Sequence, residues 1–316
     1  MNPQVDRLIQ MLAAIQAQGA PRLWELPPDV ARRAADAMFV SMWNGDGPEM
    51  AETREVEIPG RRGAVPARLY VPPGASRGSG GLLYLHGGGW VIGSPDTHDR
   101  LTRELAAAIG VRVLSPAYRL APEHPYPQGL DDCVDAARWL GDHGEALGID
   151  AGRLLIGGDS AGGNLTAATL LRLRTEGGPA FRGAIYIYGA FEMDADTPSR
   201  VAWGERDLIL SRKVMEWFKA LYLGASGAAA DPQVSPLRGD LRGLPPAVLV
   251  VGTLDPLLSD SELFAAALER AGVPVELHVF PKGKHGVGLA PGDPVLSQWP
   301  GLCASWLRAM GLLDRH

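Results

Sequence analysis

The sequence predicts an α/β fold in which a mostly parallel central sheet is flanked by helices. Short apolar runs recur along the chain at residues 81–85, 111–115, 154–157, 184–188, 247–251 and 275–280. Stretches with apolar residues at helical spacing lie between or after them, at residues 97–109, 128–148, 160–175, 259–271 and 294–310. Strands that consist almost entirely of apolar residues are typical of a parallel sheet covered on both faces.

Two helices are expected in the first 45 residues, before the sheet begins. Apolar residues recur at helical spacing in the first, and Pro28 is placed to open the second. The first contains Val5, Leu8, Ile9, Leu12 and Ile15; the second has Val30, Ala34 and Met38 on one face, with Ala31, Ala35 and Phe39 beside them. These helices either pack at the edge of the core or form a flap over it. Strands are expected next, at residues 55–59 and 65–71.

The alternation of strands and helices is interrupted between residues 190 and 246. This stretch contains one helical pattern, at residues 211–223, and many small residues. The alternation resumes with the apolar run at residues 247–251. We interpret the interruption as an insertion into the sheet-and-helix core and not as a second domain.

Composition and charge restrict the class of protein. With 46% hydrophobic and 21% charged residues among 316, the chain has a globular balance that excludes a disordered or coiled-coil protein. The net charge is −6 and the arginines are scattered, so neither nucleic acid nor an anionic membrane surface is an expected partner. Cys133 and Cys303 are expected to be buried thiols in a reducing compartment. The N-terminus lacks a signal-peptide pattern, and residues 8–21 are too few and too polar to cross a bilayer, so we expect a cytoplasmic protein without membrane insertion.

A five-residue motif links the apolar run at residues 154–157 to the helical pattern after it and reads Gly158-Asp159-Ser160-Ala161-Gly162. A serine at such a strand-to-helix turn holds its hydroxyl out at the carboxyl edge of the sheet, where it can act as a nucleophile. The alternative is a glycine-rich connection without a catalytic role, and the strand before and helix after the motif argue against it. Ser160 is therefore the candidate nucleophile.

A second glycine motif ends the run at residues 81–85 and reads His86-Gly87-Gly88-Gly89-Trp90. Consecutive glycines let a substrate approach the backbone, so that N–H groups can stabilise a developing oxyanion. We expect Gly88 and Gly89 to donate from this loop, and Ala161 to donate from the start of the helix after the serine. A phosphate-binding loop is the alternative, but no Lys-Ser/Thr pair follows and no G-x-G-x-x-G is formed. His86 is expected to be structural and to hold the loop by a hydrogen bond.

A serine nucleophile needs a histidine base, and in this type of sheet the chain order is serine, acid, histidine. After Ser160 the histidines are His278, His285 and His316. His285 is the candidate base because it lies in a glycine-containing loop just after the last apolar run. His278 lies within that run, and His316 ends the chain.

The base needs a carboxylate that orients it, and Asp255 is the candidate because it follows the apolar run at residues 247–251. Asp260 and Glu262, within the next helical pattern, are the alternatives. Capping a helix is the alternative role for Asp255. No group of histidines, cysteines and carboxylates has metal-ligand spacing, so neither a metal nor another cofactor is expected.

In this combination of motifs the sequence resembles the bacterial hormone-sensitive-lipase-like carboxylesterases, a family of the α/β-hydrolase fold. The resemblance covers most of the chain and rests on HGGGW from His86, GDSAGGN from Gly158, and residues 118–127, 235–237, 244–246, 255–257 and 285–286. It implies a carboxylesterase with Ser160, Asp255 and His285 as catalytic triad. It also implies a helical cap, made of residues 1–45 and an insertion at about 190–232, on a catalytic domain of residues 46–316.

The resemblance also bears on the substrate contacts, which we expect at Trp90, Tyr188 and Val287. Val287 stands where the family usually has an aromatic residue, and residues 258–260 replace a frequent Arg-Asp-Glu. In the segment 118–127, Arg119 and Glu123 are free to pair and to support the site.

These observations predict hydrolysis of short to medium acyl esters of small molecules, through a covalent acyl-enzyme on Ser160. An amidase or formamidase with the same triad is an alternative, because no motif distinguishes an amine from an alcohol leaving group. A non-catalytic small-molecule receptor on the same scaffold is a second alternative, although a receptor has no need for the three triad residues together. A homodimer is consistent with the family.

Overall fold

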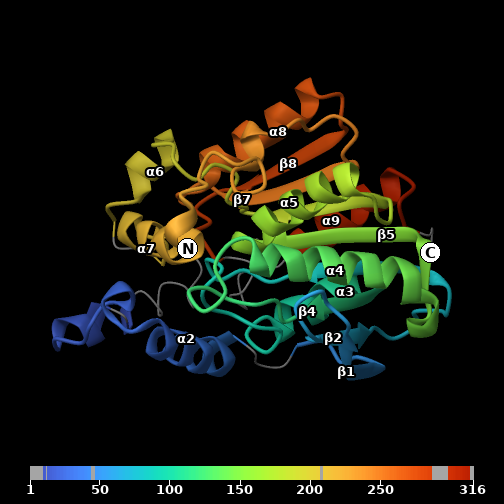
Figure 1. Ribbon diagram of the computed structural model, residues 1–316, viewed down its shortest axis with the longest axis horizontal. Coiled ribbons are helices and arrows are strands. Elements are labelled where there is room, and N and C mark those ends of the chain that lie inside the picture. Colours follow the sequence, from blue (N-terminus) through green and yellow to red (C-terminus); the bar gives the residue numbers. More distant parts are fainter. Residues whose placement is uncertain (1–9, 12, 44–46, 207–208, 287–297, 314–316) are drawn as a thin grey trace.

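The computed structural model describes residues 10–11, 13–43, 47–206, 209–286 and 298–313. Within these ranges the chain forms one eight-stranded sheet in the order β1-β2-β4-β3-β5-β6-β7-β8 (Figure 1). Its strands are β1 (Glu52–Ile58), β2 (Val65–Val71), β3 (Ser79–Leu85), β4 (Arg112–Pro116), β5 (Ile149–Asp159), β6 (Phe181–Ile187), β7 (Ala247–Gly252) and β8 (Val275–Phe280). Strand β2 pairs antiparallel with β1 and β4, and every other pairing is parallel. The prediction of a mostly parallel sheet is confirmed.

Helices cover both faces of the sheet, as its apolar strands predict. On one face lie α4 (Gln128–His143), α5 (Ala161–Glu176) and α8 (Leu258–Arg270); on the other lie α3 (Asp99–Ile109) and α9 (Trp299–Ala309). Successive residues of a central strand therefore enter different cores. In β3, Leu83 and Leu85 pack with the first set of helices, whereas Leu82 and Tyr84 pack with the second.

Several element boundaries differ from the expectations. Strand β5 begins well before the apolar run at residues 154–157. Its first residue, Ile149, is buried and pairs with Ser79 of β3, whereas residues 150–153 are exposed or only partly buried. The helix expected over residues 128–148 ends at His143 and continues as the 3₁₀ turn η2 (Gly144–Leu147). The structure adds α6 (Pro198–Trp203) to the insertion, which no apolar pattern predicted. The expected start of the last helix at residue 294 lies outside the described residues.

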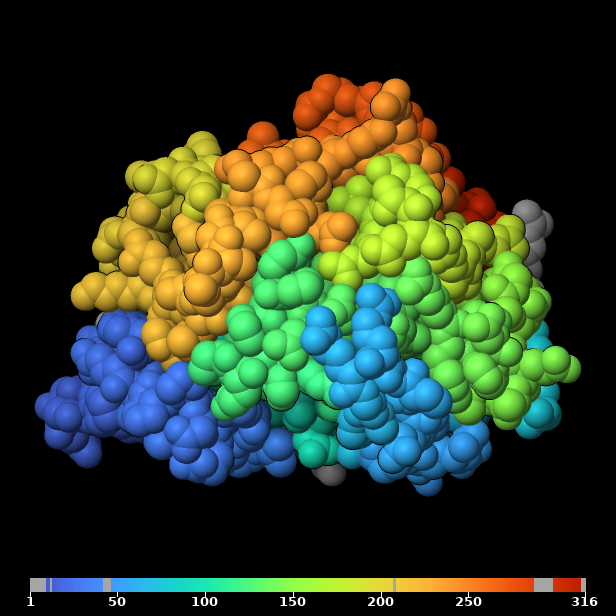
Figure 2. Space-filling model, in the orientation of Figure 1, coloured from blue at the N-terminus to red at the C-terminus, as the bar shows by residue number. Residues whose placement is uncertain are grey.

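The N-terminal segment lies at the end of the molecule where the insertion also lies (Figures 1 and 2). Helix α2 (Pro28–Trp43) is present as expected, and residues 13–17 are helical, whereas most of the first expected helix lies outside the described residues. Ala31 and Ala35 form the buried face of α2, whereas Ala34, on the neighbouring face, is exposed. The physical reason is that α2 packs on loops and on the insertion, not on the sheet.

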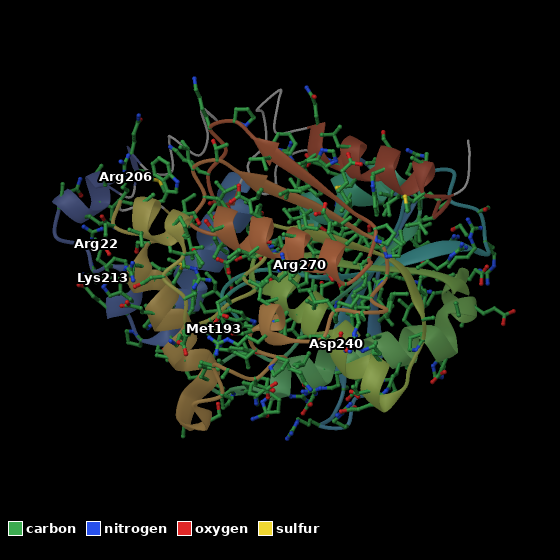
Figure 3. The ribbon with its side chains drawn as sticks, turned by 90° about the horizontal axis from the view of Figure 1, so that it is seen from above. Arg22, Met193, Arg206, Lys213, Asp240 and Arg270 are labelled. Carbon is green, nitrogen blue, oxygen red and sulfur yellow. The ribbon has the colours of Figure 1, made fainter. Side chains whose placement is uncertain are left out.

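The insertion contacts the N-terminal segment through helix α7 (Arg212–Leu223). Lys213 of α7 lies 5.9 Å from the ring centre of Trp24, in the 3₁₀ turn η1 (Leu23–Glu25), and Arg22 lies 5.7 Å from the same ring. Figure 3 shows Arg22 and Lys213 together at this end of the molecule. Among the helices of the described ranges, none combines the length and the hydropathy that crossing a bilayer requires.

Candidate active site

Ser160 occupies the sharp turn between β5 and α5, where the motif predicts it. Its backbone angles are φ 52° and ψ −118°, a conformation that non-glycine residues rarely adopt. The chain can pass this close to β3 because residue 162 is glycine: a Cβ atom there would lie 1.9 Å from the Leu85 carbonyl oxygen. The sequence around Ser160 therefore allows a strained turn that presents the hydroxyl group at the carboxyl edge of the sheet.

His285 and Asp255 lie in line with Ser160. The Ser160 Oγ is 3.0 Å from His285 Nε2, and His285 Nδ1 is 2.9 Å from Asp255 Oδ2. Asp255 follows β7, is fully buried and also accepts the Leu257 N–H at 2.8 Å. Tyr188, which follows β6, packs its ring edge-on against the His285 ring at 4.7 Å. Loops after four neighbouring strands, β5 to β8, thus bring together residues that are far apart in the sequence.

The alternative acids and bases lie elsewhere. Asp260 Oδ1 accepts the N–H groups of Phe191 and Glu192, both at 3.1 Å, and forms an ion pair with Arg200 at 2.7 Å. Asp260 therefore anchors the insertion and does not contact the imidazole; burial raises its pKa to about 6. Glu262 is exposed on α8, and His278 lies in β8 beside Glu276. His316 is outside the described residues.

The glycine loop lies opposite Ser160. Gly88 has φ 117° and would place a Cβ atom 2.1 Å from the Ile92 carbonyl oxygen, so no other residue fits there. The Gly88 carbonyl accepts the N–H groups of Val91 at 3.1 Å and Ile92 at 2.9 Å, which closes the loop into a turn. Within the described part of the chain, the N–H groups of Gly88 and Gly89 have no acceptor.

Ala161 is the first residue of α5, so its N–H belongs to the four at a helix start that no carbonyl of the helix can accept. The positive end of the helix dipole lies at the same point and favours a negative oxygen. The chemistry that this geometry allows is the stabilisation of an oxyanion by three backbone donors.

His86 is held inside the glycine loop and does not contact Ser160. Its Nδ1 lies 2.8 Å from the Gly87 carbonyl oxygen, its ring stacks on Tyr118 at 4.2 Å, and its Nε2 is buried without a partner. Burial lowers the pKa of His86 to about 3, so the ring is neutral and its Nδ1–H donates to the carbonyl. This agrees with the structural role that the sequence analysis gave to His86.

The segment 118–127 supports the site in a different way from the one expected. Arg119 forms an ion pair with the fully buried Asp132 of α4, and Glu123 forms one with Arg32 of α2 at 2.8 Å. The expected pairing of Arg119 with Glu123 is therefore wrong. The reason is that two helices, α4 and α2, approach the segment from different sides and each supplies a partner.

Two cavities meet at Ser160. The larger has a volume of about 430 Å³ and is lined by Met38 and Phe39 of α2, by Tyr188 and by His285. The smaller has a volume of about 230 Å³ and lies under the insertion, with Trp90, Ala161, Met193, Met215 and Leu257 in its walls. Gly89 and Phe218 of α7 border both.

Of the residues expected to contact the substrate, Trp90 lines the smaller cavity and Tyr188 the larger one, and Val287 lies outside the described residues. Sequence reasoning missed several residues of the smaller cavity, among them Glu192, Asp194 and Arg200. These residues belong to the insertion and carry no motif, so no local signal could have indicated them.

A serine in line with a histidine and a buried aspartate, next to free backbone N–H groups at the carboxyl edge of a parallel sheet, is the arrangement of serine hydrolases of the α/β-hydrolase class. The model of a protein family with the α/β-hydrolase fold matches residues 82–289, and the chain belongs to this family. Its resemblance to the hormone-sensitive-lipase-like carboxylesterases is confirmed, and the chain is an ester-hydrolysing enzyme.

Relatives with names of this kind match most of the chain. It is 36% identical to an ethyl acetate hydrolase of Pseudomonas putida over 90% of this chain and 91% of that protein. It is 38% identical to the carboxylic ester hydrolase LipN of Mycobacterium tuberculosis over 76% of this chain but 65% of that protein. Among solved structures, a hyperthermophilic esterase of the archaeon Pyrobaculum calidifontis has a TM-score of 0.88 and 33% identity, covering 96% of this chain and 98% of that one.

Proposed function

We propose that the enzyme hydrolyses short to medium acyl esters of small molecules, with Ser160, His285 and Asp255 as catalytic triad and a covalent acyl-enzyme as intermediate. The observation that carries this proposal is the continuous line from Ser160 Oγ through His285 to Asp255, with contacts of 3.0 and 2.9 Å. This line ends where two cavities and three backbone donors meet, so an ester carbonyl has room beside the hydroxyl group.

In the proposed mechanism His285 removes the proton of Ser160, whose oxygen attacks the ester carbonyl. The N–H groups of Gly88, Gly89 and Ala161 stabilise the oxyanion of the tetrahedral intermediate. His285 then donates its proton to the leaving alcohol, and water attacks the acyl-enzyme by the same steps in reverse order. Asp255 holds the imidazole in the tautomer that carries its proton on Nδ1 and stabilises the imidazolium.

The two cavities support the proposed size of the acyl group. Because His285 must protonate the leaving alcohol, the alcohol group lies next to His285, in the larger cavity. The acyl chain then enters the smaller cavity. Ion pairs border the smaller cavity, namely Lys219 with Asp194 and Arg212 with Asp196. Each buried methylene gains about 0.8 kcal/mol until the chain reaches these charges, whose desolvation is costly. We therefore expect a preference for acyl chains of roughly four to eight carbons.

The alternatives from the sequence analysis remain outcomes of the test. An amidase or formamidase would use the same residues, and a receptor would bind the ester without cleaving it. The N-terminal segment and the insertion are proposed as a cap over the cavities that they line. A cytoplasmic location and a homodimer stay predictions.

The test is an activity profile over 4-nitrophenyl esters from acetyl to palmitoyl, with butyryl anilide as the matched amide of the butyryl ester. The expected result is a maximum between butyryl and octanoyl, with slow or no anilide cleavage. Ser160→Ala should lower ester turnover by about 10³-fold or more. The matched control is Ser226→Ala, which changes an exposed serine of the insertion. A faster reaction on the anilide would favour the amidase, and binding of esters without any turnover would favour the receptor.

A further inference from the structure

Arg32 connects helix α2 to two loops of the sheet-and-helix core. Its Nε donates to the Val91 carbonyl oxygen at 2.9 Å, and its Nη2 donates to the Ala121 carbonyl oxygen at 3.0 Å. Its guanidinium also forms the ion pair with Glu123. The Arg32 side chain is 24% exposed and that of Glu123 is 47% exposed, so the carbonyl contacts lie deeper than the ion pair.

Both carbonyl contacts lead to the glycine loop. The Val91 N–H donates to the Gly88 carbonyl at 3.1 Å, and the Ala121 N–H donates to the Trp90 carbonyl at 2.9 Å. Between Gly88 and Val91, Trp90 has φ 61°, a left-handed conformation that a bulky residue keeps only where its surroundings hold it. The Arg32 guanidinium group therefore binds one carbonyl of the glycine loop and one of the segment 118–127, and both residues are hydrogen-bonded to the turn that contains Trp90.

Helix α2, which carries Arg32, also forms a wall of the larger cavity. Ala35, one turn along α2 from Arg32, packs in a buried cluster with Val91, Ala121 and Phe218. Met38 and Phe39, further along the helix, line the cavity itself. A displacement of α2 would therefore move a cavity wall and release the turn together.

We propose that Arg32 is a positioning residue for ester hydrolysis. It holds the turn that presents the Gly88 and Gly89 N–H groups to the oxyanion, and it does so through the Val91 and Ala121 carbonyls rather than through its ion pair. The inference rests on the proposed function, because the position of these N–H groups matters for turnover only if they bind the oxyanion.

Arg32→Ala is expected to lower kcat/KM on the butyryl ester by about 30-fold, mainly through kcat, because a displaced oxyanion donor is partly lost to the transition state. The inhibition constant of 1-butaneboronic acid should rise by a similar factor, because its tetrahedral serine adduct uses the same donors. Millimolar guanidinium chloride should restore part of kcat by occupying the vacated position. Arg32→Lys, which cannot reach both carbonyls with one fixed planar group, should lie between wild type and Arg32→Ala.

Two variants serve as matched controls. Arg33→Ala removes the next arginine of α2, which is 69% exposed and pairs with Asp29 of the same helix, and should stay within about twofold of wild type. Glu123→Gln removes the ion pair but keeps both carbonyl contacts and should stay within about threefold, because an exposed ion pair contributes little.

Some results would overturn the inference. One is an Arg32→Ala enzyme that loses only thermal stability and keeps the wild-type kcat and boronate affinity. For this comparison, kcat is calculated from the concentration of active sites, measured by titration. Another is a loss in Glu123→Gln as large as in Arg32→Ala, which would assign the effect to the ion pair. Turnover near the wild-type level in Ser160→Ala would instead contradict the proposed function, so the two failures are distinguishable. If Arg32→Ala does not fold, Arg32→Lys and its boronate affinity decide the question.

Discussion

Asp159 Oδ1 accepts the backbone N–H of Gly87 at 2.9 Å, so the residue before Ser160 also holds the glycine loop opposite it. The same oxygen accepts the Tyr84 hydroxyl at 2.7 Å, and Oδ2 lies 3.3 Å from His98 Nε2. Burial raises the pKa of Asp159, but His98 and Tyr84 outweigh burial and hold it below its usual value. A buried carboxylate thus links the two motifs that the sequence analysis singled out separately.

Asp159→Ala should disturb this link without touching the triad. The Gly87 N–H and the Tyr84 hydroxyl would be left buried and unpaired, which costs about 1–3 kcal/mol each. We expect a lower urea midpoint and a fall in kcat of at least about tenfold, because the loop loses its fixed position relative to Ser160. Urea unfolding and steady-state kinetics on the butyryl ester measure both effects. Wild-type kcat in a folded Asp159→Ala enzyme would mean that the glycine loop is held by other contacts alone.

Ser160→Ala should lower turnover by about 10³-fold or more while leaving the urea midpoint near that of wild type. His285→Ala should cost about the same, and the double variant should cost little more than either, because triad residues act as a unit. Single-turnover and steady-state rates of the three variants check this. Independent, multiplicative losses in the double variant would contradict a shared role.

His86→Asn should change how stability depends on pH. The folded-state pKa of His86, about 3, lies below the ordinary 6.5, so the unfolded chain binds a proton in this range that the folded chain does not. The contribution of His86 is therefore present above about pH 6.5 and is lost as pH falls toward 3.

Asparagine can keep the donation to Gly87 but does not titrate. Between pH 7 and pH 4.5 the wild type should therefore lose about 2–3 kcal/mol more unfolding free energy than the variant. Urea titrations of both proteins across this range give the difference, and parallel pH curves would show that His86 does not carry it.

Asp260→Ala should weaken the attachment of the insertion. The change would leave Arg200, which is 9% exposed, without its anionic partner and would free the N–H groups of Phe191 and Glu192. Removing one partner of a buried ion pair costs about 3–5 kcal/mol. Thermal unfolding measures the loss, and Asp240→Ala, which breaks an exposed pair with Arg242, is the control. Equal small effects in both variants would contradict a structural role for Asp260.

Deleting residues 1–40 should show whether the N-terminal segment belongs to the site. The deletion removes most of α2 and with it a wall of the larger cavity, so apolar surface is exposed and ester turnover should fall sharply. Soluble yield and kcat/KM on butyryl and octanoyl esters are the measurements. A soluble truncated enzyme with unchanged turnover would show that these residues only pack at the edge of the core.

Local patterns predicted the sheet and the position of the nucleophile. Leu82 and Leu83 are both apolar because each enters a different core, and this alone indicates a strand covered on two faces. Ser160 could be placed because a close, strained turn between a strand and a helix requires the glycines that flank it. Chain order then selected Asp255 and His285, which the structure brings into contact.

Partners that depend on packing between distant segments could not be predicted in this way. Arg119 meets Asp132 and Glu123 meets Arg32 because helices α4 and α2 approach the segment 118–127, and no periodicity encodes that approach. The cavities form only where α2, α7 and the loops after the strands converge. Periodicity and turn chemistry depend on neighbouring residues, so they show how each short segment is buried. The partner of a charged side chain depends on which distant segments the fold brings next to it, and the sequence contains many candidates.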